Sequence, residues 1–112
     1  IHWSTTVRVC NFIIIKVMAE FRFDDGVVGY FEPGPGDKKY RVTLYQNGQR
    51  WKTVTFGDRR YEHFEDKTPL MLYSYQNHYD ENRRRSYRAR HGAQGYQNEK
   101  YSPAWFSWWF LW

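Results

Sequence analysis

Alternating apolar and polar positions predict β-structure in the first half of the chain. Phe21 and Phe23 alternate with charged residues, and the apolar run 27–31 follows an Asp25-Gly26 turn signal. This pattern predicts a short antiparallel hairpin. Two prolines and two glycines within residues 32–37 then predict a loop, because proline lacks a backbone donor and glycine favours turns.

A second hairpin is predicted from the alternating runs 38–45 and 50–56, which Gln46-Asn47-Gly48-Gln49 joins. Asn-Gly favours a type I′ turn with a two-residue loop. This register places Leu44 opposite Trp51 and Val42 opposite Thr53, so that Trp51 is expected to be buried. We expect one face to hold Tyr40, Val42, Leu44 and Trp51, and the other to hold Arg41, Arg50 and Lys52.

Helical signals dominate the second half. Short helical turns are expected between residues 58 and 79. Asp80 is a candidate N-cap, Glu81 adds an acid to the first turn and Gly92 is a stop signal, so residues 80–91 are predicted to form a helix. Ser102 and Pro103 provide an N-cap and a first-turn proline for a final helix.

The predicted fold is therefore α+β, with a small antiparallel β-hairpin or sheet packed against two short C-terminal helices. Residues 18–112 are expected to form one small domain. Two interpretations of residues 1–17 stay open. They are an extraneous segment upstream of a start at Met18-Ala19-Glu20, or a strand built on Val7, Val9, Phe12 and Ile14.

Composition narrows the class of function. The 17 Lys and Arg residues against 12 Asp and Glu give a formal charge of +5, which favours an anionic partner. Cys10 is the single cysteine, so no intrachain disulfide forms and a reducing, intracellular setting is the default. The four histidines and Cys10 lack metal-ligand spacing, and no nucleophile elbow or phosphate-binding glycine loop is present. We therefore expect a non-enzymatic protein with no metal, cofactor or small-molecule substrate.

The predicted helix 80–91 is the first candidate binding site, because it carries Arg83, Arg84, Arg85, Arg88 and Arg90. One interpretation is contact with phosphates of nucleic acid or another anionic surface. The alternative is structural: Tyr87 and His91 pack inward, Arg84 pairs with a carboxylate such as Asp66, and the other arginines are only solvated.

The final helix carries an aromatic stripe, since its tryptophans have helical spacing. The stripe consists of Trp105, Phe106, Trp108, Trp109 and Trp112. It is expected either to cover the hairpin as part of the core or to contact another protein. Insertion into a membrane interface is disfavoured, because Ser102 and Ser107 give the polar face no positive charge.

From Phe56 to the end, the chain resembles an uncharacterised protein family of large DNA viruses of eukaryotes, with relatives in some tailed phages. The matching residues are Phe56-Gly57, Tyr61, Phe64, Asp66-Lys67-Thr68-Pro69-Leu70, Leu72-Tyr73-Ser74, His78, Asp80, Arg84, Tyr87, Arg90-His91, Tyr101-Ser102-Pro103-Ala104-Trp105-Phe106-Ser107 and Leu111-Trp112. The resemblance implies a viral origin but supplies no active site, because the biochemical role of the family is unassigned.

Together, the resemblance and composition predict a structural or accessory protein of a large DNA virus, most concretely a minor capsid or virion component. Its expected partners are other virion proteins and the viral genome, the latter through phosphate contacts, with no membrane partner. Its expected locations are the virion and, during assembly, the host cell cytoplasm. The alternative is a free, non-specific nucleic-acid-binding protein, which would use the same arginines.

Overall fold

The computed structural model describes residues 4–11 and 15–112, and these residues form a five-stranded antiparallel sheet followed by two α-helices. Each strand pairs with the next along the chain, in the order β1-β2-β3-β4-β5. The strands are β1 Ser4–Asn11, β2 Ile15–Arg22, β3 Val28–Pro33, β4 Lys38–Gln46 and β5 Gln49–Asp58. A 3₁₀ turn, η1, spans Ser74–Gln76, and the helices are α1 Glu81–Gly92 and α2 Pro103–Phe110.

Both α-helices begin where their predicted caps place them. The Asp80 carboxylate accepts hydrogen bonds from the backbone N–H groups of Asn82 and Arg83 at the start of α1. The Ser102 hydroxyl accepts from Trp105 N at the start of α2, where Pro103 occupies the first turn. The α+β prediction, with an antiparallel sheet and two late helices, is confirmed.

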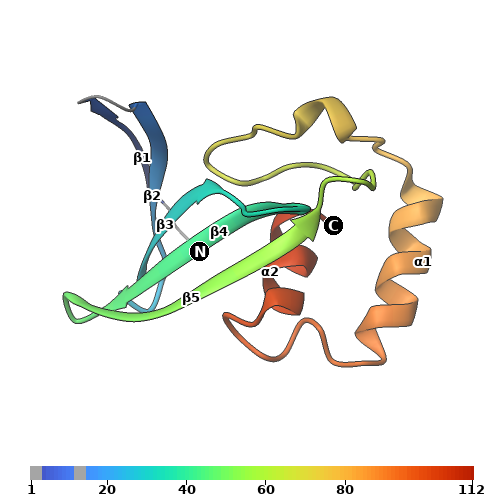
Figure 1. The fold of residues 1–112 in the computed structure, drawn as a ribbon. Helices are drawn as coiled ribbons and strands as arrows, with labels where there is room; N and C mark the ends of the chain where they lie inside the picture. The colour runs from blue at the N-terminus through green and yellow to red at the C-terminus, as the bar shows by residue number, and fades with distance from the viewer. Residues whose placement is uncertain (1–3, 12–14) are drawn as a thin grey trace.

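The helices lie in two layers beside the sheet (Figure 1). α2 packs on β5, and α1 lies on the side of α2 away from the sheet. Aromatic rings fill the space between α2 and the sheet: Phe106 stacks on Phe56 at 5.2 Å between ring centroids and meets Phe31 edge-on at 6.1 Å. α2 therefore completes the aromatic core, and α1 packs against the opposite side of α2.

The second hairpin has the predicted turn but a different register. Asn47 and Gly48 have φ values of 53° and 76°, as a type I′ turn requires. The pairing shifts between Leu44 and Tyr45, so Leu44 lies opposite Lys52 and Val42 opposite Val54. The predicted pairs Leu44–Trp51 and Val42–Thr53 are therefore wrong, because β5 accommodates one extra residue.

Trp51 is the residue that this shift changes most. Its side chain is 44% exposed rather than buried, and it contacts the core only at its margin, edge-on to Tyr101 at 5.6 Å. Lys52, which was expected beside Arg41 and Arg50, now lies opposite Leu44, and its ammonium lies 4.7 Å from the centre of the Trp51 ring. The other predicted core positions, Tyr40, Val42 and Leu44, are fully buried.

Two further expectations concern less regular segments. The helical turns expected between residues 58 and 79 are reduced to η1. At the N-terminus, β1 includes Val7 and Val9 and pairs with β2, whereas Phe12 and Ile14 lie outside the described residues. Met18 lies inside β2, opposite Arg8. Whether a chain beginning at Met18 folds by itself stays a prediction.

We predict that Phe106→Ala lowers the free energy of unfolding by about 4 kcal/mol, because Phe106 is fully buried among the rings of the core. Trp51→Ala should cost only about 1 kcal/mol, since much of that ring is already in water. Urea unfolding of both variants measures the difference. Equal losses would contradict the assignment of the core to the α2 side of the sheet.

Candidate anion-binding surface

α1 is held against the C-terminal end of the chain by an aromatic stack. Tyr87, the buried residue of α1, lies parallel to Trp112, with centroids 4.3 Å apart and an angle of 4° between the planes. His78 contacts the same indole at 5.2 Å, and Trp108 lies 6.2 Å from Tyr87. The inward packing predicted for Tyr87 is confirmed. His91 is only half-buried and stacks on Tyr96 at 4.3 Å.

The stack fixes where the predicted aromatic stripe lies. Trp105, Phe106 and Trp108 are buried and Trp112 is half-buried, so they belong to the core and to the α1 contact. Trp109 is the exception, because 43% of its surface is exposed.

The five arginines of α1 point in different directions because Tyr87 faces inward. Arg83 forms an ion pair with Glu62 at 3.0 Å, and Arg85, on the solvent side, bonds only to the Asn82 amide among the described residues. Arg90 lies beside His91, with its Nε 3.3 Å from the ring Nε2. The arginines therefore form no single stripe.

Arg84 and Arg88 lie one helical turn apart and both rest on aromatic rings. The Arg84 guanidinium carbon is 4.5 Å from the centre of the Phe64 ring, and that of Arg88 is 5.3 Å from Trp108. Arg84 pairs with a carboxylate as expected, but the partner is Glu81, at 3.5 Å, and not Asp66. Arg88 donates to the backbone oxygen of Trp112 at 3.3 Å.

Lys67 adds a third positive charge to this flank, and sequence reasoning missed it as a candidate. Its backbone N–H donates to the Phe110 carbonyl at 2.8 Å, which fixes the residue to the end of α2. Partial desolvation of its otherwise exposed side chain, followed by the charge of Arg84 and, more weakly, that of Arg88, lowers the pKa of Lys67, although Glu65 opposes the shift. Burial and the charge of Arg84 also lower the pKa of Arg88. Repulsion between like charges is thus built into this surface.

The loop that carries Lys67 is organised by Asp66, which is 3% exposed. Its carboxylate accepts hydrogen bonds from the Tyr40 hydroxyl at 2.5 Å, from the Thr68 hydroxyl at 2.6 Å and from Tyr73 N at 3.0 Å. The Tyr40 oxygen in turn accepts from Leu72 N at 2.9 Å. Asp66 was expected to form an ion pair with Arg84. It is instead buried, and its carboxylate accepts the hydrogen bonds that hold the loop together.

A second buried polar group lies where β4 ends against the same loop. Lys39 is 2% exposed and donates to the Tyr61 carbonyl at 2.8 Å and to His63 Nδ1 at 2.6 Å. His63 Nε2 lies 2.6 Å from the Asn77 amide oxygen, which assigns the ring proton to Nε2. Burial lowers the pKa of Lys39 to about 8, while burial and then the Lys39 charge lower the pKa of His63 to about 4.

Gly57 makes room for the Lys39 side chain. Its φ of +77° is a left-handed conformation that favours glycine, and an added Cβ would lie 2.9 Å from Lys39 Cβ and 3.1 Å from Leu111 Cδ1. Any larger residue here would displace either the lysine or the end of α2.

Lys39 and His63 lie at the base of a groove of about 370 Å³, whose rim includes Asp58, Arg90 and Trp112. Lowered pKa values in a groove are typical of reactive side chains. However, both residues are at most 2% exposed, and their polar atoms bond to one another or to the loop. This arrangement is sufficient to explain them as structural groups.

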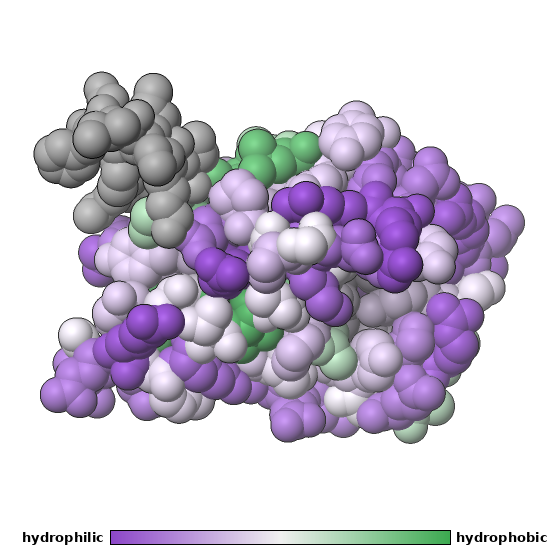
Figure 2. Space-filling view, in the orientation of Figure 1, coloured by the Kyte–Doolittle hydropathy of each residue, from purple (hydrophilic) through white to green (hydrophobic). Residues whose placement is uncertain are grey.

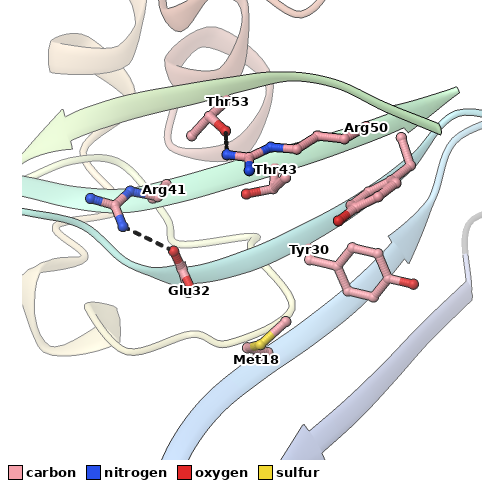
Figure 3. A pocket seen from close by; sticks show the side chains of 8 residues that line it. Met18, Tyr30, Glu32, Arg41, Thr43, Arg50 and Thr53 are labelled. Atoms are coloured by element: carbon pink, nitrogen blue, oxygen red, sulfur yellow. Dashed lines mark hydrogen bonds and ion pairs between the residues drawn. The ribbon is translucent and has the colours of Figure 1, made fainter.

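A second groove, of about 490 Å³, opens on the sheet face opposite α2 (Figure 3). The side chains in it include Tyr30, Thr43 and Arg50, and the Arg50 guanidinium donates to the Thr53 hydroxyl at 3.1 Å. Arg41 is paired with the buried Glu32 at 3.2 Å. The groove therefore contains charges of both signs. It is less suited to binding an anion than the surface of α1.

Figure 2 shows that the side of the molecule where α1 lies is largely hydrophilic. The described residues contain no group of three or more His, Cys, Asp or Glu side chains placed to hold a metal ion. Within residues 4–11 and 15–112, no helix combines the length and apolar character needed to cross a membrane.

Comparisons of the chain with protein-family models, with curated proteins and with solved structures find no match.

The buried His63 predicts a pH-dependent stability. The unfolded chain takes up a proton on this ring near pH 6.5, whereas the folded ring stays neutral down to about 4, so acid favours unfolding across this interval. We expect His63 to account for a loss of up to roughly 3 kcal/mol between these pH values. Urea unfolding of the wild type and of His63→Gln at several pH values isolates this contribution. Parallel stability curves for the two proteins would contradict it.

Proposed function

We propose that the protein is a non-enzymatic binding module that contacts an anionic partner through the arginines of α1. The partner that fits these side chains best is the phosphate backbone of a nucleic acid. Guanidinium groups bind phosphate oxygens in a matching planar geometry, and the release of counterions from the nucleic acid favours the complex.

The observation that carries this proposal is the presentation of the charge on a fixed helix. Tyr87 locks α1 onto Trp112, and Asp80 caps its first turn. The backbone that carries the arginines therefore needs no further ordering when a partner binds. This preorganisation lowers the entropic cost of binding.

Contact without base readout is the mode that this helix supports. A recognition helix needs several side chains on one outward face to reach base edges in the major groove. Here Arg83 and Arg90 line a surface pocket together with Tyr87. Arg84 and Arg88 rest on aromatic rings, and Arg85 points to solvent. Arginine side chains that point in different directions can reach phosphates along the backbone more easily than base edges in one groove.

We predict weak, salt-sensitive binding to duplexes of any sequence. About three phosphate contacts, from Arg83, Arg85 and Arg90, give a slope of about −3 for log K against log salt. Arg85→Gln and Arg90→Gln should each reduce the magnitude of this slope by about 1, while Arg50→Gln, on the open sheet face, should leave it unchanged. Titrations of labelled duplexes at several salt concentrations measure these slopes.

A strong preference for one duplex sequence would contradict backbone contact. No binding even at low salt would reject nucleic acid as the partner and leave an acidic protein surface for the same arginines.

The more concrete role that we propose is that of a minor virion component, and its support is the viral resemblance together with the exposed aromatic residues. Tyr75 is 77% exposed and Tyr61 is 65% exposed, and aromatic residues are enriched in protein–protein contacts. Weak phosphate contacts would suffice in a particle, because many copies act together. Mass spectrometry of purified particles separates this role from that of a free nucleic-acid-binding protein, which would be absent from them.

A further inference from the structure

We propose that Lys67, Arg84 and Arg88 together bind a single phosphate group at the junction of the 59–80 loop, α1 and the end of α2. This site uses a different flank of α1 from the residues assigned to duplex contact. It can therefore be tested independently of that proposal.

Two of the three residues lie on α1 and the third lies on the loop that precedes it. Arg84 and Arg88 share one side of α1 because they are four residues apart. Phe64 lies under the first guanidinium and Trp108 under the second. Lys67 is bound through its backbone to Phe110.

The rings orient the guanidinium groups without neutralising them. Glu81 is the one carboxylate that pairs with this cluster among the described residues, and its distance of 3.5 Å from Arg84 is long for a charge-assisted hydrogen bond. Arg88 bonds to the backbone oxygen of Trp112, and its buried Nε has no hydrogen-bond partner among the described residues. The two guanidinium groups thus keep N–H groups that no described residue accepts.

Electrostatics agrees with the geometry. Partial burial is the largest cause of the lowered pKa values of Lys67 and Arg88. The charge of Arg84 lowers both further, against opposing effects of Glu65 on Lys67 and of Glu81 on Arg88. An anion bound between these cations would relieve their mutual repulsion. A phosphate dianion matches the cluster, because it can accept hydrogen bonds from two guanidinium groups and one ammonium group at once.

Calorimetric titration of the full chain with inorganic phosphate, at low and constant chloride, tests the site. We expect saturable binding that weakens by about tenfold in Lys67→Gln and in Arg88→Gln, because each removes a charge-assisted hydrogen bond. Lys67 is exposed, so its variant should fold normally even if Arg88→Gln does not. The matched control is Arg50→Gln, which lies on the open face of the sheet and should retain the wild-type affinity for phosphate.

Two oligonucleotides identify the source of the phosphate. If a 5′-phosphorylated strand competes with inorganic phosphate better than the same strand with a 5′-hydroxyl, the site takes a nucleic-acid end. If the two strands compete equally while phosphate still binds, the site takes a free phosphate or a small phosphorylated molecule. Absence of saturable phosphate binding, or equal affinity in Lys67→Gln and the wild type, would overturn the proposal.

Discussion

The buried Asp66 carboxylate is the constraint on which the arrangement of the binding surface depends. The segment between β5 and α1 has only η1 as regular structure, so its backbone donors need other partners. Asp66 supplies an acceptor for Tyr73 N and Thr68 N and joins the loop to β4 through the Tyr40 hydroxyl. Burial and the bond to Asp66 raise the pKa of Tyr40, which keeps its proton in place as the donor.

The two ends of this loop position the residues of the anion-binding surface. One end brings Phe64 under Arg84 and joins Lys67 to α2. The other carries His78 to Trp112, beside the Tyr87 stack. Residues far apart in the sequence therefore meet at one junction, where they position positive charge. The aromatic content of the chain is used mainly for this positioning and for the core, and Trp109 and Tyr75 are among the rings left in water.

Local signals predicted the fold well because they act over a few residues. The caps at Asp80 and Ser102 and the turn at Asn47 and Gly48 are set by neighbouring backbone groups. The shift at Leu44 and Tyr45 was missed because the register of the two-residue turn was extended along β5. Val54 and Phe56 alternate in the opposite phase to Trp51, and this pattern indicates the extra residue.

Long-range partners could not be predicted in the same way. Lys39 with His63, Asp66 with Tyr40 and Lys67 with Arg84 are brought together only by the loop, from positions that have no mutual spacing signal. The arginines of α1 were found from composition, but their three directions depend on the Tyr87 stack. Lys67 could have been noticed only through its place in the Asp66-Lys67-Thr68-Pro69 motif.

The central claim is that positive charge on α1, and not on the open face of the sheet, meets the partner. Nuclear magnetic resonance of the arginine Nε–H groups during titration with a short 5′-phosphorylated duplex tests this claim most directly, because each arginine gives its own signal. The account predicts shifts at Arg83, Arg85 and Arg90 and none at Arg41 or Arg50. Shifts confined to Arg41 and Arg50 would contradict it.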